Sequence, residues 1–173
     1  MKKILLASML LACTSIFAQD VKPAEPDFVG EAYILKADGT TEPLDKSKFN
    51  ITMKPGLKMK QYLEVPGCCS RTKVQASAEP LKVVIKMKDN SVDPTALINI
   101  FKFEVKKDRT TEVSSTALMG KSDQGGKIKY AEFSGKKYGQ SSYLLTIVAS
   151  ESGEYGILIK EMGNQNISCF GVN

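Results

Sequence analysis

The chain has 173 residues, a formal net charge of +5, and neither histidine nor tryptophan. Without histidine, Ser-His-Asp and Cys-His catalysis and histidine-ligated metal sites are excluded. The lysines are dispersed along the chain and no tryptophan could stack on a base, which disfavours nucleic-acid binding. A P-loop and a G-x-G-x-x-G motif before a helix are also missing, so the sequence predicts no cofactor, no metal and no enzyme activity.

The first predicted element is a secretory signal peptide over residues 1–18. Lys2 and Lys3 precede an uncharged, mostly apolar run over residues 4–17, and Ala18 offers the cleavage point. The run is shorter than the roughly 20 residues that a membrane span needs. We therefore expect no transmembrane span, and a mature protein that is periplasmic or associated with the outer membrane or cell surface.

A lipid anchor is the alternative to soluble export. Leu10-Leu11-Ala12-Cys13 resembles a bacterial lipobox, in which Cys13 is lipidated and becomes the new N-terminus. Soluble export is favoured because Leu11 occupies a position that usually holds a smaller or β-branched residue. In both cases residues 19–26, polar with two prolines, are predicted to be a flexible leader.

Period-two alternation of apolar and polar side chains dominates residues 27–173. Residues 81–88 and 101–106 each place apolar side chains on one face and mostly charged side chains on the other. Residues 143–149 are apolar on both faces, as in a central strand. We predict an all-β fold, a single domain built as an antiparallel two-sheet β-sandwich with at most short helical turns. Two lobes divided near residues 120–126 are the alternative.

Turn signals separate the predicted strands. Asp38-Gly39 predicts a hairpin, and polar turns at residues 151–154 and 163–166 predict that the last three strands form an antiparallel meander. Asp93-Pro94 predicts one short helical turn. Residues 45–49 are interpreted as a further turn.

Three cysteines remain after removal of the leader: Cys68, Cys69 and Cys169. Export to an oxidising compartment favours disulfides. Neighbours in an extended chain point to opposite faces, so we expect one of the pair to bridge to Cys169. A bridge between Cys68 and Cys69, or three reduced buried thiols, are the alternatives. The spacing does not match a C-x-x-C redox motif, and three cysteines without histidine cannot complete the usual zinc site.

Paired carboxylates remain as a catalytic alternative, because two of them suffice to hydrolyse a glycoside. The candidates, which also suit the wet face of a sheet, are Glu104, Glu112, Glu132, Glu151, Glu154 and Glu161. Residues 89–94, DNSVDP, copy the start of an EF-hand calcium loop, but Pro94 stands where the loop needs glycine and Ile100 where it needs glutamate. A turn is therefore expected there. Tyr138, in the loop GKKYGQSS, is the candidate for a surface contact.

Four segments resemble uncharacterised secreted β proteins of Gram-negative bacteria. They are FVGEAYILKADGTTEPLDK, EPLKVVIKMKDNSVDP, SGEYGILIK and CFGV. The resemblance extends over most of residues 27–173 and implies export and an all-β fold. Its motifs are strands and turns, so it implies no catalytic residues.

The sequence thus predicts a non-enzymatic cell-envelope protein that binds a protein, peptide or glycan partner. A carboxylate-dependent glycoside hydrolase is one alternative. An assembly factor that pairs with a partner through a sheet edge is the other.

Overall fold

The computed structural model describes residues 25–173 except 57, 78, 118–121, 125–126 and 161–164. The predicted signal peptide, Cys13 and most of the predicted leader lie outside the described residues. Within them, regular structure is nearly all strand, which confirms the all-β prediction. Helix α1 (Pro94–Leu97) is one turn capped by Asp93, as expected. Among the described residues, no helix has the length and apolar character to cross a membrane.

The strands form three sheets, which are antiparallel apart from one short pairing of β6 with β16. Sheet A has the order β13 (Phe133–Tyr138), β14 (Ser142–Ile147), β7 (Leu81–Lys86), β1 (Ala32–Leu35) and β2 (Thr41–Pro43). Sheet B has the order β12 (Lys129–Tyr130), β8 (Ile98–Lys102), β15 (Gly153–Ile159), β16 (Asn166–Val172) and β3 (Asp45–Lys48), with β6 (Lys73–Val74) beside β16. Sheet C has the order β11 (Ser122–Gln124), β10 (Arg109–Ala117), β5 (Lys58–Val65) and β4 (Asn50–Lys54), with β9 (Glu104–Val105) beside β10.

Sheet B is the middle layer, because both of its faces are buried. One face packs on sheet A in a large core that includes Val83, Ile85, Leu145, Ile157 and Phe170. The other face packs on the base of sheet C in a smaller core of Leu63, Val65, Phe101, Phe103, Ile167 and Cys169. The predicted sandwich is therefore present as sheets A and B, and sheet C adds a layer that the sequence did not predict.

Alternation along β15 and β16 explains how one sheet serves two cores. Tyr155 and Ile157 face sheet A, and Gly156 between them faces the smaller core. A methyl group on Gly156 would lie 2.8 Å from the ring of Phe103, so the missing side chain allows that ring to approach the sheet. Strands buried on both faces lose the simple apolar–polar pattern.

Three local predictions are wrong. Residues 45–49 are not a turn, because β3 pairs with β16 over Asp45–Lys48. The last three strands are not a meander, because β14 belongs to sheet A while β15 and β16 belong to sheet B. Val105 does not continue the buried face of Phe101 and Phe103; it is 42 % exposed because the chain leaves sheet B after Lys102 and joins sheet C as β9.

The hairpin predicted at Asp38-Gly39 is confirmed. It joins β1 to β2, with Gly39 at a φ of 82° that glycine accommodates without strain. The two-lobe alternative falls on β11 and on residues outside the described ones, so it remains a prediction.

Candidate functional site

The structure joins Cys68 to Cys69 in a disulfide and leaves Cys169 as a free, buried thiol. The expected bridge to Cys169 is therefore wrong, and the alternative pairing is the one that the structure contains. The reason is the placement of Cys169 on the face of β16 that packs into the smaller core, where burial raises the pKa of its thiol to about 11. Cys68 and Cys69 lie instead in an exposed loop, residues 66–69, between β5 and β6.

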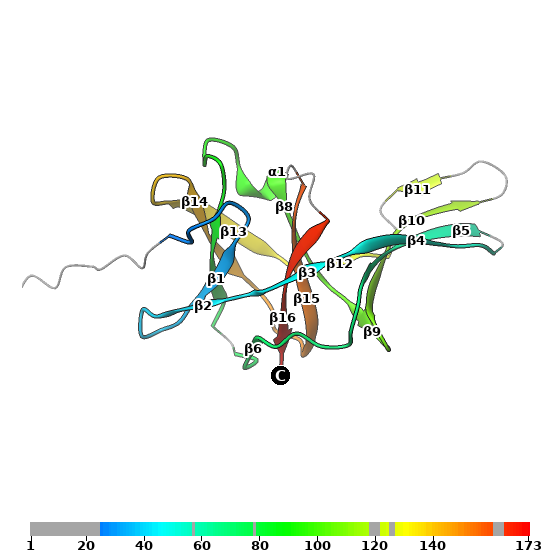
Figure 1. The fold of residues 1–173 in the computed structure, drawn as a ribbon, viewed down its shortest axis with the longest axis horizontal. Coiled ribbons are helices and arrows are strands. Elements are labelled where there is room, and N and C mark those ends of the chain that lie inside the picture. The colour runs from blue at the N-terminus through cyan, green and yellow to red at the C-terminus, as the bar shows by residue number, and fades with distance from the viewer. Residues whose placement is uncertain (1–24, 57, 78, 118–121, 125–126, 161–164) are drawn as a thin grey trace, which may run out of the picture.

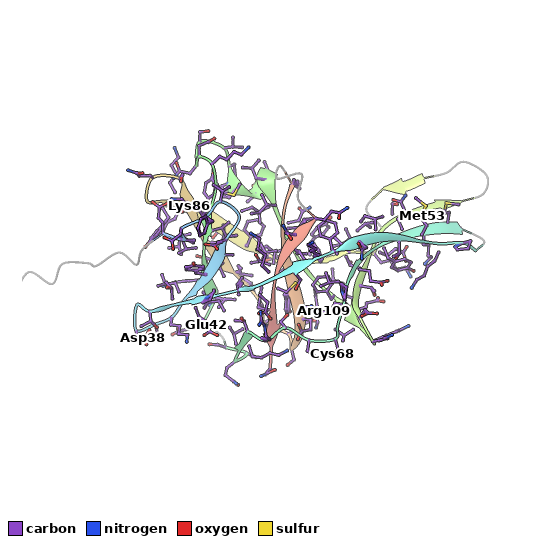
Figure 2. The ribbon with its side chains drawn as sticks, viewed as in Figure 1. Asp38, Glu42, Met53, Cys68, Lys86 and Arg109 are labelled. Carbon is purple, nitrogen blue, oxygen red and sulfur yellow. A yellow bond between two sulfur atoms is a disulfide. The ribbon has the colours of Figure 1, made fainter. Side chains whose placement is uncertain are left out.

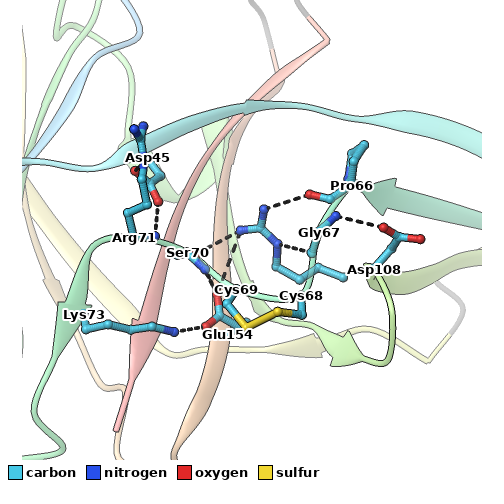
Figure 3. Close-up of a disulfide and its surroundings, with 11 residues drawn as sticks. Asp45, Pro66, Gly67, Cys68, Cys69, Ser70, Arg71, Lys73, Asp108 and Glu154 are labelled. Carbon is cyan, nitrogen blue, oxygen red and sulfur yellow. Dashed lines mark hydrogen bonds and ion pairs between the residues drawn. A yellow bond between two sulfur atoms is a disulfide. The ribbon is translucent and has the colours of Figure 1, made fainter.

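Polar contacts hold the backbone just before the disulfide (Figure 3). The Arg109 guanidinium donates from Nε to the carbonyl oxygen of Gly67 (3.1 Å) and from Nη2 to that of Pro66 (3.3 Å). The Gly67 N–H donates to Oδ1 of Asp108 (2.8 Å). The side chain of Arg109 is buried, so its two bonds are partly shielded from competing water, whereas the bond between Gly67 and Asp108 is exposed.

A second set of contacts holds the backbone just after the disulfide. The N–H and hydroxyl of Ser70 both donate to Oε2 of Glu154, at 2.8 and 2.6 Å. Nη1 of Arg109 donates to the Ser70 hydroxyl at 2.9 Å, and Lys73 pairs with the other oxygen of Glu154. Burial raises the pKa of Glu154, but its bonds to Lys73 and Ser70 outweigh burial and lower the pKa overall.

We call Ser70, Lys73, Arg109 and Glu154 the buried ionic cluster. Every guanidinium nitrogen of Arg109 already donates to the loop, and Glu154 is an ionised acceptor. The cluster therefore suits holding a loop in place better than proton transfer, which needs a group with an accessible proton and a pKa near neutrality. Cys68 and Cys69 are both exposed residues, and their disulfide is the bond of this loop that a thiolate could attack.

Beyond the body of the molecule, sheet C extends as an arm, defined as β4, β5, β10 and β11 (Figure 1). Figure 2 shows Met53 far out on this arm, with Arg109 and Cys68 at its base. The β4–β5 register pairs Ile51 with Leu63 and Met53 with Gln61, so these side chains share a face. Leu63 is buried in the smaller core, whereas Ile51 is 51 %, Met53 60 % and Met59 51 % exposed.

We call Ile51, Met53 and Met59 the apolar face of the arm. The opposite face carries charged and polar side chains that contact one another. Lys60 pairs with Glu112 at 2.8 Å, and the Tyr62 hydroxyl donates to the same carboxylate at 3.3 Å. The Lys60 bond lowers the pKa of Glu112. The arm is thus amphipathic, with half-exposed apolar side chains on one face and paired charges on the other.

A second surface runs along one extended stretch of chain, residues 41–54. Strands β2, β3 and β4 follow one another with one residue between each, and they form an edge of sheets A, B and C respectively (Figure 1). Lys46 and Lys48 are exposed on β3. A long uncovered strand is the feature that pairing through a sheet edge requires.

The candidate carboxylates are bound to lysines or exposed, and Glu132 and Glu151 alone among the described candidates line one hollow together. Glu112 pairs with Lys60, Glu151 pairs with Lys102 at 2.9 Å, and Glu154 belongs to the buried ionic cluster. Hydrogen bonds from lysine lower the pKa of Glu112 and of Glu151, the opposite of what a general acid requires. Glu132 is exposed, and Glu161 lies outside the described residues.

Glu104 lines a shallow hollow on the charged side of sheet C. Glu64 and Asp108 line the same hollow, together with Lys54, Lys106 and Lys107. Three lysines among three carboxylates balance the local charge. Asp108 also accepts a hydrogen bond from the N–H of Gly67. Two of the predicted candidates, Glu132 and Glu151, share a different hollow, where Lys102 and Lys129 lie beside them.

Residues 89–93 form a connecting loop before α1, and its carboxylates bond locally. Oδ1 of Asp89 accepts from the N–H of Ser91 at 2.9 Å, and Oδ1 of Asp93 accepts from the N–H of Thr95 at 2.8 Å. Tyr138 ends β13 half-buried, where burial and the charge of Glu25 raise the pKa of its hydroxyl. Its role as a surface contact stays a prediction.

Sequence reasoning missed Glu25, Arg109 and the apolar face of the arm. Glu25 lies in the predicted flexible leader but pairs with Lys86 at 2.7 Å and accepts from the Ser142 hydroxyl at 2.6 Å. Arg109 bonds mainly to carbonyl oxygens, which leave no trace in the sequence. Ile51 and Met53 alternate with polar residues in the sequence. Such alternation predicts a buried face, but both side chains are exposed on the arm.

The chain matches no protein-family model, no curated protein and no solved structure.

Proposed function

We propose that this chain is an exported, non-enzymatic interaction protein whose arm binds another protein through its apolar face. Export rests on the predicted signal peptide. The observation that carries the binding role is the half-exposed side chains of Ile51, Met53 and Met59 on a sheet face that continues the smaller core outward. Exposed apolar patches of this kind mark interaction sites in soluble proteins.

Methionine suits such a surface. Its unbranched side chain adapts to irregular partner surfaces, and two of the three exposed side chains of this face are methionines. Covering the apolar face with a partner would bury the exposed half of each side chain, at about 1 kcal/mol or more for each. Gln61 lies on the same face, but its Oε1 already accepts from the Ser114 hydroxyl at 2.8 Å, so an apolar protein surface is a better partner than a glycan.

The test compares two double variants that remove equal numbers of exposed apolar side chains. The arm variant is Met53→Ser with Met59→Ser. The control is Val92→Ser with Val148→Ser, whose side chains are 46 % and 50 % exposed elsewhere on the molecule. A photo-crosslinking amino acid in place of Ile51 would identify the partner in cells. Binding of the purified partner is then measured by calorimetry.

We expect the arm variant to raise Kd by about tenfold or more, because 1.4 kcal/mol corresponds to a factor of ten. The control variant should bind like the wild type. Equal binding by the arm variant and the wild type would refute the proposal.

A second candidate function is strand pairing along residues 41–54, favoured by their position at the edge of all three sheets. A partner strand carrying acidic side chains would suit Lys46 and Lys48, because opposite charges directly across a ladder are favourable. Crosslinking distinguishes the two modes. Strand pairing predicts crosslinks from Ser47 on β3 as well as from β4, whereas binding to the apolar face predicts crosslinks from the arm alone.

A further inference from the structure

We propose that the Cys68–Cys69 disulfide is a site of reversible thiol–disulfide exchange with an external dithiol. This goes beyond the proposed binding function and does not depend on it. The first observation is the contrast in access: Cys68 and Cys69 are exposed, whereas Cys169 is fully buried. Because exchange requires a thiolate to reach a sulfur atom, access separates reactive from inert cysteines.

The second observation is that the loop does not depend on the disulfide for its position. Pro66 and Gly67 are held by Arg109 and Asp108, and Ser70 is held by Glu154 (Figure 3). These contacts use backbone atoms and side chains other than the two sulfurs. A bridge between sequence neighbours also closes almost no chain, so losing it costs little in the chain-entropy model. The protein should therefore stay folded when the pair is reduced.

The exchange proceeds in two displacements. The thiolate of the dithiol attacks one cysteine sulfur and forms a mixed disulfide, the Cys68–Cys69 bond breaks, and the other cysteine leaves as a thiolate that takes up a proton. The second thiol of the reagent loses its proton, and the thiolate attacks the reagent sulfur that is bonded to the cysteine in the mixed disulfide. The remaining cysteine leaves as a thiolate and is also protonated. Two electrons pass to the protein pair, and the reagent becomes a cyclic disulfide.

The oxidised and reduced forms of the protein present different groups at the loop. The oxidised form presents a closed ring of two residues, and the reduced form presents two adjacent thiols at the base of the arm. Since β5 ends at Val65 and β10 begins at Arg109, which pair in register, the reaction takes place where the arm joins the body.

The experiment uses the mature chain, reduced with dithiothreitol under native conditions and then labelled with iodoacetamide. Peptide mass spectrometry reads each cysteine separately. Without reductant we expect no label on Cys68 or Cys69; after reduction we expect both to be labelled. Cys169 should react at least about tenfold more slowly, because it is buried and its pKa of about 11 leaves little thiolate.

Circular dichroism recorded before and after reduction reports whether the fold persists. Cys68→Ser with Cys69→Ser is the control that should take up no label in the native state. The inference would be overturned if the pair stayed unlabelled after reduction, or if the pair and Cys169 were labelled together with loss of the folded signal. Neither result involves Met53 or Met59, so a failure here leaves the binding proposal standing.

Discussion

Arg109 connects the disulfide loop with two sheets. It begins β10 in sheet C, bonds to Pro66 and Gly67 in the loop, and approaches Glu154 of sheet B to 3.9 Å. A buried charge is costly unless it is paired and hydrogen-bonded, and here both conditions are met. Its removal would leave carbonyl oxygens without donors and a buried carboxylate with Lys73 as its remaining cation.

We expect Arg109→Met to lower the free energy of unfolding by about 3–5 kcal/mol, as breaking a buried ion pair from one side usually does. The double variant Arg109→Met with Glu154→Gln should lose less than the sum of the two single variants, because the two side chains interact. Urea unfolding of the four proteins completes the cycle. Strict additivity would show that the pair is not coupled.

Glu25 supplies a pH-dependent contact between the start of the described chain and sheet A. Its pKa is lowered from 4.5 to about 2, chiefly by the bonds from Lys86 and Ser142. A carboxyl with a lowered pKa contributes stability above its unfolded pKa and loses that contribution as the pH falls toward the folded value. The window for this loss is therefore about pH 4.5 down to pH 2.

Glu25→Gln should lower the free energy of unfolding by about 1 kcal/mol at pH 7, because solvent screens a partly exposed ion pair. The difference from the wild type should shrink between pH 4.5 and 2. Urea midpoints at pH 7, 4 and 3 measure it. A difference that stays constant with pH would rule out the ionised carboxylate as its source.

At the scale of elements, the sequence predicted the strands better than it predicted their partners. The alternation in residues 81–88 is confirmed only in part by β7: Val83 and Ile85 are fully buried and Lys82 is exposed, but Val84 on the opposite face is fully buried as well. The order of the last strands was wrong because a turn signal marks the end of a strand and not the sheet that the next strand joins. The disulfide partner was wrong for a related reason, since it depends on which core the face of β16 meets.

Strand β5 passes from core to arm, so one strand offers a matched comparison. Leu63 and Met59 share a face, but Leu63 is buried and Met59 is half-exposed. We expect Leu63→Ala to cost about 2–4 kcal/mol and Met59→Ala to cost less than about 0.5 kcal/mol. Thermal or urea unfolding tests this. Equal losses at the two positions would mean that the apolar face of the arm is already packed against something.

At the scale of the whole molecule, stability is distributed unevenly between body and arm. Sheets A and B share the larger core, whereas the outer part of sheet C is solvated on both faces. The sequence could not predict this difference, because Ile51 and Met53 alternate in the way that buried residues do. Alternating apolar residues are buried where another sheet packs on their face and exposed where none does. Which sheets pack together follows from the topology.

Native-state hydrogen exchange should reveal the same gradient. Amides of β7, β14 and β15 should exchange most slowly, and protection should fall along β5 from Val65 toward Lys58, since local opening needs less energy where few apolar contacts break. Exchange followed by mass spectrometry or NMR measures it. Uniform protection along β5 would contradict a weakly held arm.

The position of β16 has a consequence for how the chain matures. Residues 166–172 lie between β15 and β3 and supply Phe170 and Val172 to one core and Ile167 and Cys169 to the other. Strand β16 is synthesised after β3, β6 and β15, the strands with which it pairs. Nascent chains halted before Asn166 would therefore lack part of both cores, so full compaction should wait until β16 has been made, and the polypeptide would pass more easily through a narrow pore until then.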